Sequence, residues 1–166
     1  MGRCKKEKAA FSVIFNGSIT VPSNDIPVAL TSWTLTTSEP DLAVPAPTKF
    51  NNYGQLNLST GVWTIVKDGY YDIFIQSMFD VLTLPTPGSV ANQAPYLQML
   101  VNGKVFSLNG TGFAGPGPIP VSVLTSAKLK KGDKVTVQVV NPTQFAASLQ
   151  ILASDGLFNS WKADKI

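Results

Sequence analysis

The sequence has no histidine, one cysteine (Cys4) and only two glutamates in 166 residues. The absence of histidine excludes Ser–His–Asp triads and Cys–His dyads, because both need an imidazole as the proton acceptor. It also excludes zinc sites built from His and Cys, and a single cysteine excludes an intrachain disulfide. The Asp-x-Asp-x-Asp spacing of a calcium loop is missing as well. We therefore expect a non-enzymatic protein with no catalytic residue, metal site or cofactor.

Charged residues are scarce, at 14% of the chain against about 25% in an average soluble domain. Residues 9–166 contain nine basic and nine acidic side chains, so the net charge of +3 lies entirely in residues 1–8. The basic residues of this N-terminal arm are Arg3, Lys5, Lys6 and Lys8. A neutral body argues against a broad nucleic-acid-binding face. The arm alone suits phosphates, an anionic lipid surface or an acidic partner, and the alternative is a solvated tail.

Long hydrophobic runs are absent too. No run approaches the roughly 18 apolar residues that a transmembrane helix needs. The apolar stretch that follows the arm, residues 9–15, is too short and too β-branched for the core of a signal peptide. We therefore expect no transmembrane segment.

The residues that are abundant indicate β-structure. Twelve prolines and thirteen glycines divide the chain into short segments rich in β-branched and aromatic residues, which is typical of strands joined by turns. The predicted strands are residues 11–15, 28–36, 56–58, 62–66, 70–79, 96–101, 104–108, 121–129, 135–140 and 148–153. Between Leu30 and Trp33 the apolar residues change parity, which predicts a β-bulge or a strand covered on both faces.

Turn residues suggest how these strands are connected. Asn102-Gly103 lies between two apolar runs and predicts a tight hairpin. The Lys67-Asp-Gly and Lys131-Gly-Asp segments predict two further hairpin turns. The segment Asn109–Pro120 is so rich in glycine and proline that we expect a long loop without regular structure.

The predicted strand at 70–79 is informative because its two faces differ. Tyr71, Ile73 and Ile75 form a fully apolar face. The opposite face mixes aromatic, apolar and polar side chains: Tyr70, Asp72, Phe74, Gln76 and Met78. This pattern predicts a strand whose first face is buried in a core and whose second face contacts something else, such as another subunit.

About eight to ten strands without an internal repeat predict an all-β protein with a single antiparallel jelly-roll β-sandwich. We assign residues 1–8 to the basic arm, residues 9–154 to the jelly roll, and residues 155–166 to an amphipathic C-terminal tail. The tail contains Leu157, Phe158 and Trp161 and is expected to be a short helical turn or an extended arm.

Several segments in order resemble a known family. These are Phe50-Asn-Asn-Tyr-Gly, Leu56-Asn-Leu, Thr60-Gly-Val-Trp-Thr-Ile, Asp68-Gly-Tyr-Tyr-Asp-Ile-Phe, Leu100-Val-Asn-Gly and Leu129-Lys-Lys-Gly-Asp-Lys-Val-Thr-Val. Their order and spacing resemble the globular heads of complement first-component subunits, which belong with the tumour necrosis factor-like trimeric jelly rolls. The resemblance covers about residues 9–154, and it implies a homotrimer.

From this resemblance and the two-faced strand we expect trimer contacts in residues 62–66, 70–79 and 96–101. The side chains assigned to the trimer interface are Trp63, Tyr71, Ile73, Phe74, Met78 and Tyr96.

The two ends of the chain are candidates for contacts with other proteins. An apolar cluster at a chain end normally docks on something, either its own domain or a neighbour. We expect the ends to anchor the subunit to other structural proteins of an assembly. The anchoring residues are Arg3, Lys5, Lys6, Lys8, Phe158 and Trp161.

Two functions remain open at this point. A low-charge surface rich in Ser, Thr and Asn suits a subunit packed in a larger assembly, and single jelly rolls are common building blocks of viral capsids. We therefore expect a structural capsid or capsid-accessory protein located in a virion. The alternative is a free-standing trimeric head, extracellular or at the cell surface, that recognises protein or glycan through its loops.

Overall fold

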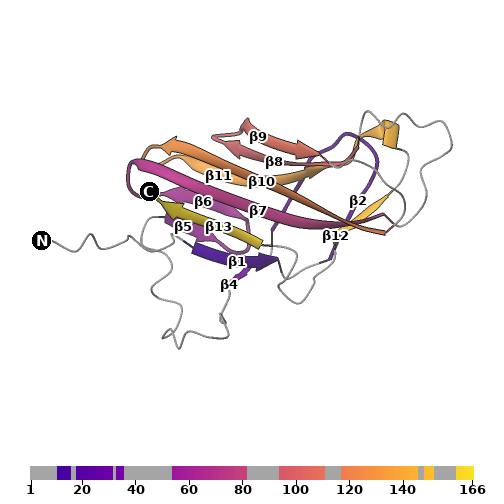
Figure 1. Ribbon diagram of the computed structural model, residues 1–166, viewed down its shortest axis with the longest axis horizontal. Helices are drawn as coiled ribbons and strands as arrows, with labels where there is room; N and C mark the ends of the chain where they lie inside the picture. The colour runs from indigo at the N-terminus through magenta and orange to yellow at the C-terminus, as the bar shows by residue number, and fades with distance from the viewer. Residues whose placement is uncertain are drawn as a thin grey trace, which may run out of the picture.

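The computed structural model describes residues 11–15, 18–31, 33–35, 54–81, 94–110, 117–145, 148–151 and 160–166. Within these residues the chain forms thirteen strands and a 3-10 helix, Thr143–Phe145. The strands make two antiparallel sheets that pack face to face (Figure 1). The predicted all-β class is thus confirmed. The strands outnumber the eight to ten expected, because the predicted strand at 28–36 is divided in two and the strands at 19–21 and 160–165 are added.

Sheet A has seven strands. In spatial order, six of them are β2 (Ile19–Val21), β12 (Leu149–Ile151), β7 (Gly69–Val81), β13 (Ser160–Lys165), β1 (Phe11–Phe15) and β4 (Trp33–Leu35). The seventh, β10 (Gly117–Leu129), pairs with β7 along its whole length, from Gly117 opposite Val81 to Leu129 opposite Gly69. Because β12 and β13 occupy the other side of β7, β10 is an edge strand of this sheet.

Sheet B has six strands. Its spatial order is β5 (Gly54–Asn57), β6 (Val62–Ile65), β11 (Lys134–Val140), β8 (Tyr96–Val101) and β9 (Lys104–Gly110), with β3 (Val28–Ala29) also paired to β11. β9 is therefore an edge strand of sheet B. The Asn109 side-chain amide donates a hydrogen bond of 2.7 Å to the Ser122 carbonyl, which ties β9 to β10 in the other sheet.

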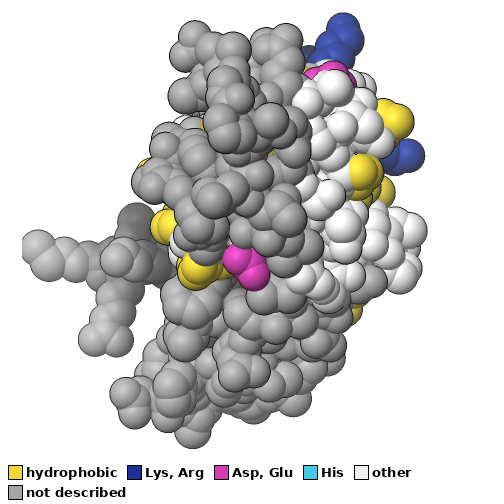
Figure 2. Space-filling view, turned by 90° about the vertical axis from the view of Figure 1, so that its right-hand side faces the viewer, with side chains coloured by type: hydrophobic (Ala, Val, Ile, Leu, Met, Phe, Trp, Pro, Cys, Tyr) yellow, Lys and Arg dark blue, Asp and Glu magenta, His cyan; other side chains and the backbone are white. Residues whose placement is uncertain are grey.

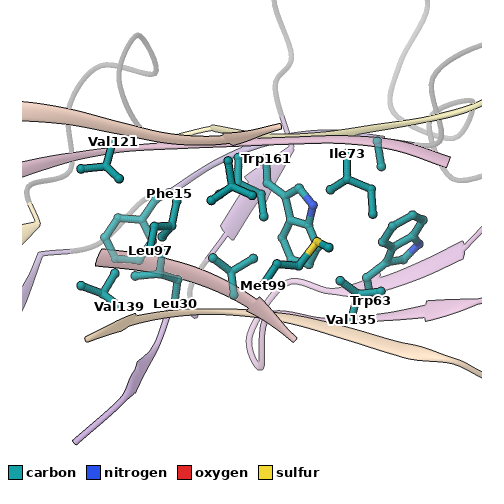
Figure 3. Close-up of a cluster of buried hydrophobic side chains, with 14 of the residues drawn as sticks. Phe15, Leu30, Trp63, Ile73, Leu97, Met99, Val121, Val135, Val139 and Trp161 are labelled. Atoms are coloured by element: carbon teal, nitrogen blue, oxygen red, sulfur yellow. The ribbon is translucent and has the colours of Figure 1, made fainter. Parts of the chain in front are cut away.

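The core lies between the sheets and follows from the period of two in the strands. In β7 the buried and half-buried residues alternate along the strand, with Tyr71, Ile73 and Ile75 fully buried. Figure 3 shows how Ile73 and Trp161 reach into the core from sheet A, while Met99 and Val135 reach in from sheet B. The predicted apolar face of the strand at 70–79 is thus confirmed as a core face.

The parity change between Leu30 and Trp33 has a different cause from the one predicted. β3 pairs with β11 in sheet B, whereas β4 pairs with β1 in sheet A. Between them Leu30 is buried in the core and its N–H donates to the Val137 carbonyl at 3.0 Å. The chain therefore crosses from one sheet to the other here, so the alternation restarts in a new sheet instead of passing through a bulge.

One of the three predicted hairpins is confirmed. Asn102 and Gly103 adopt φ angles of 52° and 76° between β8 and β9, as a tight two-residue hairpin requires. The turns at 66–68 and 130–133 do not form hairpins, because each connects strands in opposite sheets: β6 to β7, and β10 to β11. Their turn residues reverse the chain between the layers of the sandwich.

Two further expectations need correction. The segment Asn109–Pro120 is not entirely loop, since Asn109 and Gly110 end β9 and residues 117–120 begin β10. Pro118 and Pro120 are tolerated there because an edge strand has only one hydrogen-bonded neighbour. The C-terminal segment is not a separate tail either. β13 lies inside sheet A, between β7 and β1.

Candidate subunit interface

The outward face of sheet A is built from alternating apolar and polar rows. Phe74 of β7 lies directly opposite Leu124 of β10, and Met78 lies opposite Pro120. Leu124 is 75% exposed, although it sits in the middle of a long strand. A large aliphatic side chain at such a position is unusual on a surface that meets only water.

Polar rows separate these apolar rows. Asp72 accepts a hydrogen bond from the Ser126 hydroxyl across β7 and β10, and Gln76 lies opposite Ser122. Nearer the end of the sheet, the Lys128 ammonium lies 5.7 Å from the centre of the exposed Tyr70 ring, within the range of a cation–π contact. Some polar groups of this face thus already interact with other groups of the same chain. Burying them against a partner therefore costs less free energy.

A second apolar surface lies on the neighbouring edge of the sandwich. Eight large hydrophobic side chains are exposed among the described residues, and four of them lie on β9 and β10. Besides Leu124 these are Val105, Phe106 and Leu108, which are 52%, 50% and 59% exposed. We call these three side chains the β9 edge. β9 lies beside β10, because the Asn109 side chain is bonded to the Ser122 carbonyl, so the β9 edge adjoins the outward face of sheet A.

The structure divides the six residues assigned to the interface from sequence. Trp63, Tyr71 and Ile73 are fully buried in the core of a single chain, so their assignment to a subunit contact is corrected. Phe74 and Met78 lie together on the half-buried outward side of β7. Tyr96 is half-buried but belongs to β8 in sheet B, so the structure does not bring it beside Phe74.

Sequence reasoning missed Leu124 and the β9 edge, and it placed Tyr70 on the contact face of the 70–79 strand without including it among the six assigned side chains. A signal for Leu124 is visible, because it interrupts the polar positions Ser122 and Ser126 within the predicted strand. The β9 edge has apolar residues at both parities, Val105 and Phe106, which is the pattern of an edge strand that is covered on more than one side.

Of the residues that were predicted to anchor the chain to a neighbour, the structure describes only Trp161. Trp161 is fully buried between the sheets, where its ring meets Trp63 edge to face with the centroids 6.2 Å apart. It docks within its own domain, so its assignment to a contact with a neighbour is corrected. Arg3, Lys5, Lys6, Lys8 and Phe158 lie outside the described residues.

The described residues show no arrangement suited to catalysis by a metal. Within these ranges, no three His, Cys, Asp or Glu side chains come together in a group that would hold a metal ion. No helix in the described part of the chain is long and apolar enough to cross a membrane. The exposed apolar side chains described above are aliphatic and aromatic, and those of β7, β9 and β10 lie on strands.

Comparison with known proteins gives the same fold. No protein-family model matches the sequence, and no curated protein matches it. Among solved structures, the chain is similar to the Eiger tumour necrosis factor of S. frugiperda. The TM-score is 0.61 and the identity 14%, over 98% of this chain and 94% of the other. It is also similar to murine APRIL, with a TM-score of 0.59 and 11% identity over 95% and 98% of the two chains. The chain therefore has the tumour necrosis factor-like jelly-roll fold that its sequence motifs resemble.

Proposed function

We propose that this chain is a non-enzymatic binding head that works as a homotrimer, outside the cell or at the cell surface. The observation that carries the proposal is a pair of adjoining surfaces with exposed apolar side chains, the outward face of sheet A around Phe74 and Leu124, and the β9 edge. The comparisons favour a binding head over the capsid subunit that the sequence suggested, since both structures belong with the tumour necrosis factor-like fold.

The two surfaces suggest how the copies associate. They are different from each other, so the contact that buries both is heterologous: the edge of one copy against the face of the next. Such a contact closes into a ring when the rotation permits, and the trimeric jelly rolls that the sequence resembles give three copies. Each subunit would then cover Leu124 and the β9 edge, and the polar rows would supply the hydrogen bonds that set the register.

The mass in solution tests this arrangement. Size-exclusion chromatography with light scattering should give the mass of three chains for the natural sequence at micromolar concentration. In Leu124→Asp, a carboxylate replaces a side chain that is exposed in one chain and covered in the trimer. Burying an unpaired charge costs several kcal/mol, so the mass should fall to that of one chain, with the far-ultraviolet circular dichroism spectrum unchanged.

Thr20→Asp is the matched control, because it puts the same charge on an exposed position of the opposite edge strand of sheet A, β2, which β12 separates from β7. This variant should remain a trimer. A natural chain that is a stable monomer, or two variants that behave alike, would refute the proposal. Negative-stain electron microscopy separates the two functions, because a binding head gives discrete small particles and a capsid subunit gives shells or sheets.

Binding provides a second readout. Three linked sites give an avidity that exceeds the affinity of one site by about two to four orders of magnitude. Fluorescently labelled natural protein should therefore stain a responsive cell surface that the Leu124→Asp monomer stains weakly, while Thr20→Asp stains like the natural protein. Equal staining by all three proteins would show that trimerisation does not serve binding.

A further inference from the structure

The lysines of the folded body gather at one end of the sandwich. Of the eight lysines that the structure describes, seven lie in the turns at this end or within two residues of the strand ends beside them. They are Lys67, Lys104, Lys128, Lys130, Lys131, Lys134 and Lys165. The eighth, Lys162, lies in the middle of the outward face of sheet A, opposite Phe74. We call the group of seven the lysine end; the C-terminus is marked there in Figure 1.

Hydrogen bonds join the turns of the lysine end into one surface. The turn after β10 is tied to the turn after β6, because the Lys131 N–H donates to Asp68 at 2.7 Å and the Gly132 N–H donates to the Ile65 carbonyl at 2.8 Å. These bonds link Lys67, beside Asp68, to Lys130 and Lys131. The lysine side chains thus project from turns that are held in fixed relative positions.

The third turn is tied in by Asn102. Its side-chain amide donates to Asp133 at 2.9 Å, and its side-chain oxygen accepts from the Lys134 N–H at 2.9 Å. Asn102 belongs to the hairpin that leads into Lys104, so the bonds connect Lys104 to Lys134 across sheet B. All three turns therefore form a single rigid surface.

Three described carboxylates lie at this end by the same criterion: Asp68, Asp133 and the exposed Asp164 of β13. Asp68 accepts from the Lys131 N–H, and Asp133 accepts from the Lys130 N–H at 2.8 Å as well as from Asn102. The seven lysines outnumber these three acids, and two of the acids are occupied in holding the turns together. The exposed lysines, among them Lys104, Lys130, Lys131 and Lys134, give this end a strong positive potential.

Among the described residues, the charged groups at the opposite end of the sandwich are acidic. They are Asp25 and Asp80, and no described lysine lies there. Figure 2 views the molecule from that side, and the basic side chains that it shows lie at its upper and right-hand margins. The body is neutral in total charge but is polarised along its length. A polarised neutral body approaches a charged surface in one orientation.

An exposed apolar residue also lies within the lysine end. Val66 begins the turn between β6 and β7, next to Lys67, and its side chain is exposed. The chain also enters β1 at this end, since Phe11 pairs with Ala163 near the end of β13. In the sequence, Ala9 and Ala10 separate Phe11 from the basic arm, residues 1–8, which carries a charge of +3 and lies outside the described residues.

We propose that the lysine end binds the surface of an anionic phospholipid bilayer. The lysines come from several turns at one end of the sandwich, so they form a broad surface. Proteins usually bind a nucleic acid or a linear polysaccharide along a groove or a stripe instead. Lysine stems extend toward headgroup phosphates, and Val66 suits the boundary between headgroups and acyl chains. This inference needs only one chain and is independent of the trimer.

Vesicle co-sedimentation with the full chain tests the proposal. The probes are vesicles of phosphatidylcholine alone and vesicles with about one third phosphatidylserine, which carry the negative surface potential. We expect binding only to the second kind, with the bound fraction falling steeply between about 0.05 M and about 0.3 M NaCl as screening increases. Binding to neither kind, or equal binding to both, would overturn the proposal.

Substitutions locate the site. Lys131→Gln should weaken partitioning about fivefold, since a lysine near an anionic surface is worth about 1 kcal/mol. The triple variant Lys130→Gln, Lys131→Gln, Lys134→Gln should weaken it roughly a hundredfold by the same figure. These positions bond to their neighbours through backbone N–H groups, so the fold should survive. Val66→Ser should lower binding about twofold to threefold as apolar area is lost.

Lys162→Gln, made in the monomeric Leu124→Asp chain, is the matched control, because there it removes one exposed positive charge from the outward face of sheet A and disturbs no subunit contact. It should bind like Leu124→Asp alone. A loss equal to that of Lys131→Gln would mean that net charge alone matters and would overturn the assignment of the surface. So would binding to heparin or duplex DNA with the same lysine dependence when the vesicles are not bound. The monomeric Leu124→Asp variant should still bind, which separates this test from that of the trimer.

Discussion

Trp63 of sheet B and Trp161 of sheet A meet edge to face in the middle of the sandwich, with their ring centroids 6.2 Å apart and their planes at 84°. Trp63 makes a second edge contact with Tyr71, at 5.4 Å and 83°. Both geometries suit the ring quadrupole, which favours an edge against a face. Trp161 comes from the last strand, far in the sequence from the consecutive strands β6 and β7 that supply Trp63 and Tyr71, so these contacts fasten the C-terminal strand to both layers.

The first prediction concerns Trp161. Trp161→Ala should lower the free energy of unfolding by about 3 to 5 kcal/mol, because it removes a fully buried indole and leaves a cavity beside Trp63. Urea unfolding followed by circular dichroism measures the change. Lys162→Ala, at the next and exposed position, should stay within about 0.5 kcal/mol of the natural chain. Equal effects of the two substitutions would mean that Trp161 is not part of the core.

The second prediction concerns the ends of the chain. A chain truncated after residue 155 lacks β13, which leaves β7 and β1 without their shared neighbour and removes Trp161 from the core. We expect it to lose cooperative thermal unfolding. Deletion of residues 1–8 removes no described residue, so that chain should melt like the natural one. A truncated chain with a sharp melting transition near that of the natural protein would contradict the placement of β13.

The third prediction isolates backbone conformation at the Asn102-Gly103 hairpin. Gly103 has a φ of 76°, and a Cβ atom there would meet nothing within 4 Å. Gly103→Ala should therefore destabilise the protein by about 1 to 2 kcal/mol through strain alone. In Gly110→Ala the new Cβ would meet Tyr96 at an ordinary 3.6 Å, so a change below about 0.5 kcal/mol is expected. The urea midpoints of the two variants show whether stability is lost only at the strained turn or wherever a glycine receives a side chain.

Local patterns in the sequence were sufficient for most of the strands and for the two faces of β7. The alternation in residues 70–79 predicted which side chains of β7 are buried, and Asn102-Gly103 predicted its hairpin, because both depend on residues adjacent in the chain. The alternation does not say what covers each face. Tyr71 and Ile73 were therefore assigned to a subunit contact, although they fill the core of one chain.

The sequence did not predict which distant strands pair with each other. The segments Lys67-Asp-Gly and Lys131-Gly-Asp turn the chain as expected, but turn residues do not specify whether the next strand joins the same sheet or the opposite one. The strand β13 was missed because only Trp161 and Ala163 of its side chains point inward. Its alternation is visible in retrospect, yet its place between β7 and β1 depends on strands more than 80 residues away.

The carboxylate of Asp133 links stability to pH at the lysine end. Its pKa is lowered from 3.8, chiefly by the hydrogen bond from the Lys130 backbone N–H and then by the one from the Asn102 side chain; the nearby Lys130 charge adds a smaller effect. A carboxyl group whose pKa is lower in the folded than in the unfolded chain stabilises the fold when it is ionised. Its contribution is complete above the unfolded-state pKa and disappears as the pH falls through the folded-state pKa.

The last prediction concerns Asp133 and follows from the direction of its pKa shift. Asp133→Asn keeps the shape of the side chain but removes its charge, so the variant should be less stable than the natural chain at neutral pH. As the pH falls from about 4 toward the lowered pKa of Asp133, the natural chain loses this advantage and the two stabilities should converge. Urea midpoints measured from neutral to strongly acidic pH test the convergence. If the difference between the two chains is the same at both ends of this range, the ionised carboxylate is not what stabilises the turn, and the three turns of the lysine end are held by their other hydrogen bonds.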